Sequence, residues 1–111
     1  MAYDEDLANR LRELLADEDA VTEKRMFGGL AFLLGGNMSV SASGRGGLLV
    51  RVDPRDTDEC LALPYVVLME MAGRTMEGWL KVAPAGLETD EELSAWVARS
   101  LAYVKTLPAK R

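Results

Sequence analysis

Three short apolar or alternating segments between residues 23 and 52, joined by glycine-rich turns, constrain this chain more than any other feature. The segments are residues 30–34, 38–42 and 48–52, and the turns are Gly35-Gly36-Asn37 and Gly44-Arg45-Gly46-Gly47. In the second segment Met38, Val40 and Ala42 alternate with serines, so an extended chain would place apolar groups on one face and hydroxyls on the other. Turns this short join strands as antiparallel neighbours. The region therefore predicts a three-stranded antiparallel meander.

Helices and two more strands are predicted around this meander. Leucines 7, 11, 14 and 15 share one stripe of a helix over residues 5–17. Asp53-Pro54 begins a short helix that Pro64 stops, and Thr89-Asp90-Glu91-Glu92 is a capping box for a helix that ends before Pro108. Strands are predicted at residues 66–71 and 79–82, with a loop over residues 73–78 between them. The predicted fold is an α+β two-layer sandwich in the order α-β-β-β-α-β-β-α: one domain, residues 1–111, whose antiparallel five-stranded sheet carries helices mainly on one face.

Composition narrows the function classes. The chain has 111 residues, enough for one core, and it has no apolar window long enough to span a membrane. Its acidic start does not resemble a signal peptide, and its one cysteine, Cys60, cannot form an internal disulfide. A cytoplasmic location without membrane attachment is expected.

Charge is unevenly distributed along the chain. The net charge is −5, with acids concentrated near both ends, yet no acid occurs between residues 24 and 52. The bases in that stretch are Lys24, Arg25, Arg45 and Arg51. Four bases fall short of the basic stripe of a nucleic-acid-binding protein, and ordinary charge fluctuation explains them more simply. The sequence therefore argues against direct nucleic-acid binding.

No pattern in the chain carries a recognisable catalytic chemistry. Neither glycine pair, Gly28-Gly29 or Gly35-Gly36, is followed by the lysine and the helix of a phosphate-binding loop, so positive φ angles and close backbone approach are the favoured roles. The chain lacks histidine. Cys60 has acidic neighbours that would raise its pKa, and a buried cysteine is the favoured interpretation. No catalytic, cofactor-binding or metal-binding residue is predicted, and the chain is expected not to be an enzyme.

A set of short motifs resembles the N-terminal domain of the TfoX/Sxy family. The residues that carry the resemblance are Met26, Phe27, Gly28, Gly29, Gly36, Asn37, Met38, Arg51, Val52, Gly73, Arg74, Met76, Gly78 and Trp79. The resemblance covers about residues 5–108 and implies an α+β domain linked to transcription, since the named members regulate DNA-uptake competence, thought to act with the cyclic-AMP receptor protein. Those regulators carry a second, helical domain, and this sequence is expected to be a single-domain form lacking it.

The favoured hypothesis is a non-enzymatic regulatory or adaptor domain that acts through protein–protein contacts. The resemblance implies a partner from the transcription machinery, and the sequence does not decide whether the chain also self-associates. The candidate interaction surface is the hydroxyl-and-arginine face, with Ser39, Ser41, Ser43, Arg45, Arg51 and Arg74. Two alternatives remain: a small-molecule or anion-binding domain or small enzyme that uses the 73–78 loop with Arg74 as the anion anchor, and a weak nucleic-acid binder.

Overall fold

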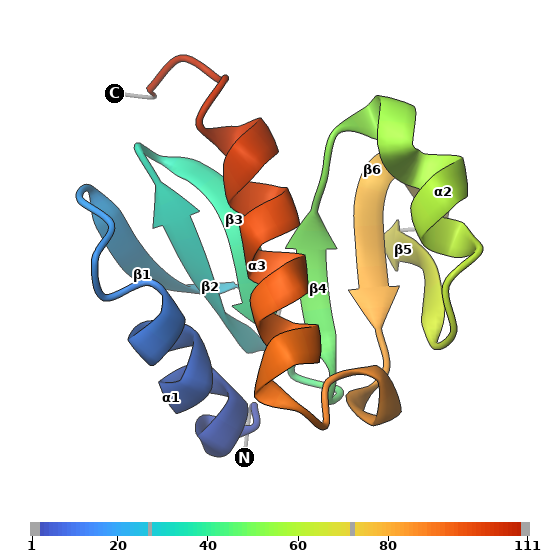
Figure 1. Cartoon of the computed structure of the whole chain (residues 1–111), viewed down its shortest axis with the longest axis horizontal. Coiled ribbons are helices and arrows are strands. Elements are labelled where there is room, and N and C mark those ends of the chain that lie inside the picture. The colour runs from blue at the N-terminus through green and yellow to red at the C-terminus, as the bar shows by residue number, and fades with distance from the viewer. Residues whose placement is uncertain (1–2, 27, 72, 110–111) are drawn as a thin grey trace.

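The computed structural model describes residues 3–26, 28–71 and 73–109 (Figure 1), and for Met71 it describes the backbone alone. Phe27, one of the residues that carry the resemblance, lies outside this part of the chain. The elements in chain order are α1 (Glu5–Leu14), β1 (Val21–Met26), β2 (Gly29–Leu34), β3 (Asn37–Ala42), β4 (Leu48–Arg51), the 3-10 turn η1 (Pro54–Asp56), α2 (Thr57–Leu61), β5 (Val66–Met71), β6 (Arg74–Val82), the 3-10 turn η2 (Pro84–Gly86) and α3 (Asp90–Val104).

All the strands join one antiparallel sheet in the order β1-β2-β3-β4-β6-β5. The sheet has six strands, so the prediction of five strands and of their order was wrong. The strand that the prediction missed is β1, an edge strand in which residues 22–25 are all exposed. Because neither face of β1 is buried, its sequence shows no alternation of apolar and polar residues that would indicate a strand.

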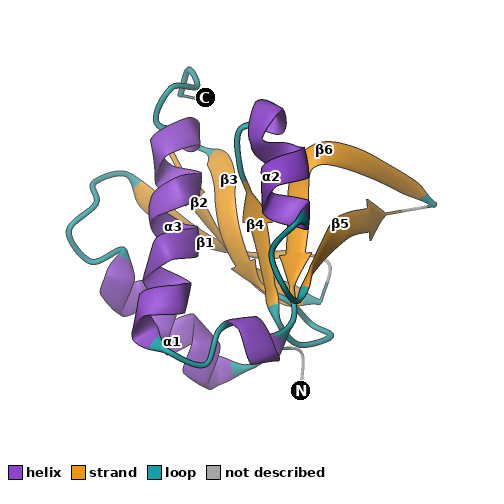
Figure 2. Ribbon diagram, turned by 45° about the vertical axis from the view of Figure 1, so that its right-hand side comes forward, coloured by secondary structure: helices purple, strands orange, loops and turns teal. Residues whose placement is uncertain are grey.

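The three helices cover one face of this sheet, as Figure 2 shows. Helix α3 packs on β3 and β4, α1 packs on β3, and α2 packs on β5 and β6. One apolar core joins all three helices to the inward side chains of β2 to β6, with Leu11, Leu93 and Trp96 among its helical members. The α+β architecture with an antiparallel sheet is confirmed.

Local predictions agree with the structure to different degrees. The capping box of α3 is present, with the Thr89 hydroxyl accepting from the Glu92 amide at 3.1 Å. The first helix ends at Leu14 rather than at residue 17, and the second divides into η1 and α2. The prediction of a loop over residues 73–78 was wrong, because residues 74–78 belong to β6. Together with β5 they form a projecting hairpin (Figure 2).

Two glycine pairs show why glycine is needed in this sheet. Gly35 and Gly36, with φ angles of +58° and +83°, form the two-residue turn between β2 and β3. At Gly29 a Cβ atom would overlap the carbonyl oxygen of Ala42 on β3. Both pairs have the backbone roles that the sequence predicted, a positive φ and a close approach. In the described ranges, no helix is both long and apolar enough to cross a bilayer.

Candidate functional site: the uncovered face of the sheet

The predicted serine face is not an exposed surface. Ser39, Ser41 and Ser43 are only 2%, 2% and 8% exposed, so the prediction that their hydroxyls meet solvent or a partner was wrong. Phe32 pairs with Val40 and Leu33 pairs with Met38, so Ser39 is the extra residue of a bulge in β3, and this bulge interrupts the alternation on which that prediction rested.

As a result Ser39 faces helix α3. Its hydroxyl lies 2.7 Å from that of Ser100, which donates to the Ser39 carbonyl oxygen at 3.0 Å. Met38 moves to the opposite face, where it pairs with Leu33. The Ser43 hydroxyl accepts from the backbone amide of Arg45 at 3.1 Å and so shapes the turn between β3 and β4. Ser39 and Ser43 therefore have structural hydrogen bonds rather than a surface role, whereas Ser41 pairs with Ala31 and Leu49 on the opposite side of the sheet.

A second apolar cluster lies on the sheet face opposite the helices, and no described helical residue belongs to it. Ala31, Met38 and Leu49 form its buried centre. Strand register assigns the side chains around this centre, because directly paired residues of neighbouring strands point to the same side. We call this side the uncovered face; its residues are Thr22, Lys24, Met26, Ala31, Leu33, Met38, Ser41, Leu49, Arg51, Val67, Met69, Trp79 and Lys81.

The charges on the uncovered face all have one sign. Lys24 pairs with Ala31, Lys81 with Leu49, and Arg51 with Trp79. In β1 to β4 the only acid is Glu23, and the other acids of the sheet, Glu70 and Glu77, lie in the projecting part of the β5–β6 hairpin. Strand alternation turns Glu23 toward the helices, where its carboxylate accepts two hydrogen bonds of 2.8 Å from Arg12 of α1, and this pairing lowers the pKa of Glu23. The uncovered face is therefore apolar and basic in a chain of net charge −5.

Arg51 is held between two aromatic rings at one end of this face. Its guanidinium carbon lies 4.7 Å from the centroid of the Trp79 ring and 5.6 Å from that of Tyr103 on α3. Arg51 is partly buried, and within the described residues it has no ion pair and no side-chain hydrogen bond.

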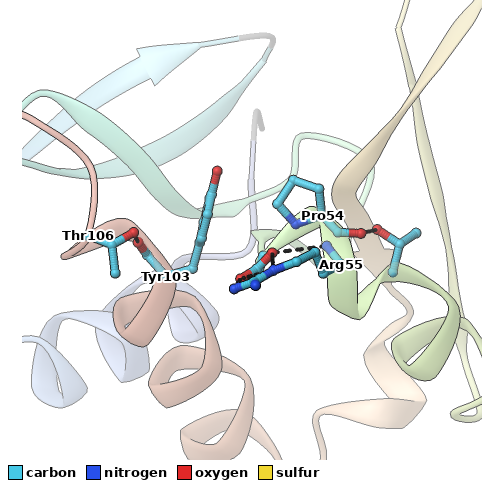
Figure 3. Close-up of polar contacts among 6 residues, drawn as sticks. Pro54, Arg55, Tyr103 and Thr106 are labelled. Atoms are coloured by element: carbon cyan, nitrogen blue, oxygen red, sulfur yellow. Dashed lines mark hydrogen bonds and ion pairs between the residues drawn. The ribbon is translucent and has the colours of Figure 1, made fainter.

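Tyr103 also lines an open groove between η1 and α3, and Figure 3 shows its lining residues Pro54, Arg55, Tyr103 and Thr106. The groove measures about 650 Å³ and is lined by Asp53, Pro54, Arg55, Asp56, Arg99, Ala102, Tyr103 and Thr106. Its arginines are already paired: Arg55 contacts Asp53 at 2.8 Å, which lowers the pKa of that carboxyl, and Arg99 contacts Glu59 at 2.8 Å. Because these charges neutralise one another, the groove attracts neither sign of ligand strongly.

Cys60 lies in α2 and is fully buried, as the sequence predicted. Burial is the largest cause that raises the pKa of its thiol; Arg99 acts in the opposite direction, and Asp56 and Glu59 add to the increase. Cys60 is therefore held as a neutral thiol, the less nucleophilic form. Within the described ranges, no cluster of three or more cysteine, aspartate or glutamate side chains could bind a metal ion.

The remaining residues predicted for a site are dispersed. Arg45 is exposed in the turn between β3 and β4, and Arg74 is exposed at the end of the β5–β6 hairpin, so the structure does not bring them to Arg51. Asn37 has a structural role, because its amide nitrogen donates to the Pro108 carbonyl at 2.9 Å. Sequence reasoning missed Tyr103, which contacts Arg51 only because α3 packs beside it. It also missed Lys81, although the two-residue spacing from Trp79 indicates that both side chains lie on the same face of the strand.

The fold and the site define a class: a small α+β domain whose sheet is covered by helices on one face and is apolar and basic on the other. Over residues 13–104 the chain matches the TfoX N-terminal domain family, and it belongs to that family. A comparison with curated proteins gave no match.

Proposed function

We propose that this chain is a non-enzymatic regulatory or adaptor domain that uses its uncovered face to bind a protein partner. One observation carries the proposal: the second face of the sheet holds an apolar cluster to which no described helix contributes. The most exposed apolar member of the uncovered face is Val67, at 57%. The centre of the cluster is buried, so the apolar surface available to a partner consists of Val67 and the partly exposed Met26, Leu33, Met69 and Trp79. Apolar surface that no helix covers is typical of sites that bind other proteins.

The chemistry of the uncovered face suggests what the partner presents. Met26, Met38 and Met69 have flexible thioether side chains that can adapt to apolar groups of different shape. Lys24, Arg51 and Lys81 lie on the same face, and none of the residues assigned to that face by strand register is acidic. A complementary partner carries apolar side chains bordered by carboxylates, because opposite charges guide association and exclude other partners.

Two further observations support a binding role without catalysis. The neutral, buried Cys60 is poorly suited to act as a nucleophile. Membership of the TfoX N-terminal domain family also fits a regulatory role, because the TfoX/Sxy regulators that the sequence resembles act in transcription. We propose a component of the cytoplasmic transcription machinery as the partner.

Adjacent residues of β1 provide a matched test. Lys24 lies on the uncovered face, whereas Arg25 pairs with Leu30 of the main core and points to the opposite side, and both side chains are exposed. Tagged wild-type protein, Lys24→Glu, Val67→Glu and Arg25→Glu are used to capture partners from nuclease-treated host lysate, and the retained protein is then titrated in purified form.

The expected result is loss of the same partner in Lys24→Glu and Val67→Glu and its retention in Arg25→Glu, with similar thermal unfolding in all four proteins. Equal capture by all variants would show that the uncovered face is not the contact surface. A signal that disappears with nuclease would instead favour nucleic-acid binding.

A further inference from the structure

Arg51 combines three features that distinguish it from the other arginines of the uncovered face and its surroundings. Its guanidinium lies against the rings of Trp79 and Tyr103, its nitrogens donate no hydrogen bond to a described residue, and no described carboxylate pairs with it. The nearby Arg55 and Arg99 each contact an acid at 2.8 Å. A guanidinium positioned by aromatic rings loses less freedom when it binds, and its planar nitrogens match the two oxygens of a carboxylate.

The surroundings of Arg51 favour a singly charged anion. Asp56 lies five residues from Arg51 along the chain, and the whole chain carries a net charge of −5. Repulsion from these charges increases with the charge of the ligand, whereas the hydrogen bonds of one guanidinium can be satisfied by one carboxylate. A phosphate group would carry the greater repulsion without a second described base beside Arg51.

We infer that Arg51, positioned by Trp79 and Tyr103, is the binding site for an aspartate or glutamate carboxylate of the partner protein. This inference rests on the proposed function and names the group on the partner that the uncovered face recognises. The partly exposed apolar residues of the uncovered face, such as Met69, would contact the residues that flank this carboxylate. Arg51 is then a binding residue, and the two rings position it.

The first experiment measures the site without the partner. Side-chain Nε–Hε resonances of the arginines are recorded by NMR during a titration with succinate, with ionic strength held constant by sodium chloride. Arg51→Lys assigns the Arg51 resonance, and the exposed Arg45 and Arg74 are internal controls. We expect a saturable shift for Arg51 alone. Equal shifts for all three arginines, no shift for Arg51, or a stronger response to inorganic phosphate would overturn the inference.

The second experiment tests whether the carboxylate belongs to a protein segment. A blocked peptide with one glutamate between leucines is compared with the same peptide carrying glutamine. We expect the glutamate peptide to bind about tenfold more tightly, the size of one charge-assisted contact, although the net charge of the protein opposes it. The advantage should disappear in Arg51→Gln and persist in Arg45→Gln. An advantage that survives in Arg51→Gln would contradict the inference.

These results separate the two proposals. If Arg51→Gln still captures the partner while Lys24→Glu and Val67→Glu do not, the uncovered face is the contact surface and only the role of Arg51 is wrong. If Arg51 binds succinate and the glutamate peptide but no face variant affects capture, the carboxylate site exists and the proposed contact surface is wrong.

Discussion

At the residue scale, Gly28 and Gly29 are adjacent but are needed for different reasons. Gly28 has a φ of +78° and open space around it, whereas a Cβ on Gly29 would overlap the Ala42 carbonyl of the neighbouring strand. We expect Gly28→Ala to lower the free energy of unfolding by about 1 kcal/mol, the cost of a left-handed conformation. Gly29→Ala should cost about 3 kcal/mol, because two paired strands must separate locally. Urea unfolding of both variants measures the difference, and equal losses would contradict this assignment.

The Ser39–Ser100 pair gives a second prediction at this scale. Ser100 donates to the Ser39 carbonyl and lies 2.7 Å from its hydroxyl, and both residues are buried. Ser100→Ala removes the partner of the buried Ser39 hydroxyl and one hydrogen bond to the Ser39 carbonyl, and should cost about 2 kcal/mol, whereas Ser39→Ala should cost about 1 kcal/mol. The double variant should be no less stable than Ser100→Ala, because it also removes the unpaired hydroxyl. Chemical unfolding of the three variants provides the test, and a larger loss for Ser39→Ala would show that the hydroxyl contact dominates.

The same residues show where sequence reasoning reaches its limit. Alternation correctly predicted that Val40 and Ala42 enter the core and that a strand occupies residues 38–42. It failed at Met38 and Ser39, because a bulge reverses the side of every residue beyond it, and nothing in the local pattern marks the bulge. The Arg51 site was predictable only in part. The sequence singled out Arg51 and Trp79, but their contact depends on the strand order. Tyr103 belongs to α3, which is distant in sequence, so its contact with Arg51 depends on how that helix packs.

At the scale of elements, helix and strand signals were reliable where one face is buried. The residues of α3 and β5 follow such a pattern, and the sequence located both. Strand β1 has no buried face and joins the fold through pairing with β2 and through the ion pair of Glu23 with Arg12 of α1. The sequence signal of an edge strand of this kind is weak because solvent accepts almost any side chain there.

This ion pair gives a prediction for pH. The hydrogen bonds from Arg12 lower the pKa of Glu23 below its ordinary value of 4.5. The pair therefore contributes stability that is present above that value and is lost as the pH falls through the lowered pKa of the folded state. The contribution is small, since both side chains are about 40% exposed, Arg12 at 43% and Glu23 at 39%.

Wild type and Glu23→Gln are compared by urea unfolding between pH 3 and pH 7. We expect the wild type to be slightly more stable near neutral pH and the two proteins to converge in acid, because protonated Glu23 no longer differs in charge from glutamine. Arg25→Gln is the control, since Arg25 lies on the same strand but has no ion pair in the described part of the chain. A difference that stays constant down to pH 3 would show that the ion pair is not its cause.

At the scale of the whole molecule, the charges of the uncovered face bear on self-association. An apolar face that lacks a covering layer could pair with the same face of a second copy. Such a pairing would bring Lys24, Arg51 and Lys81 of both copies into one interface, where like charges repel. The three bases therefore act against a face-to-face dimer while they leave the face open to an acidic partner.

Removing the bases should therefore promote self-association through this face. We expect wild-type protein to sediment as a monomer at low salt and to show weak association as salt screens the repulsion. Lys24→Gln combined with Lys81→Gln should associate more strongly than wild type at low salt, and its association should depend less on salt. Arg25→Gln, which removes a base from the opposite side, should behave as wild type. Sedimentation velocity across a salt series tests this, and a wild-type dimer that dissociates when salt is added would show that the bases join copies instead of separating them.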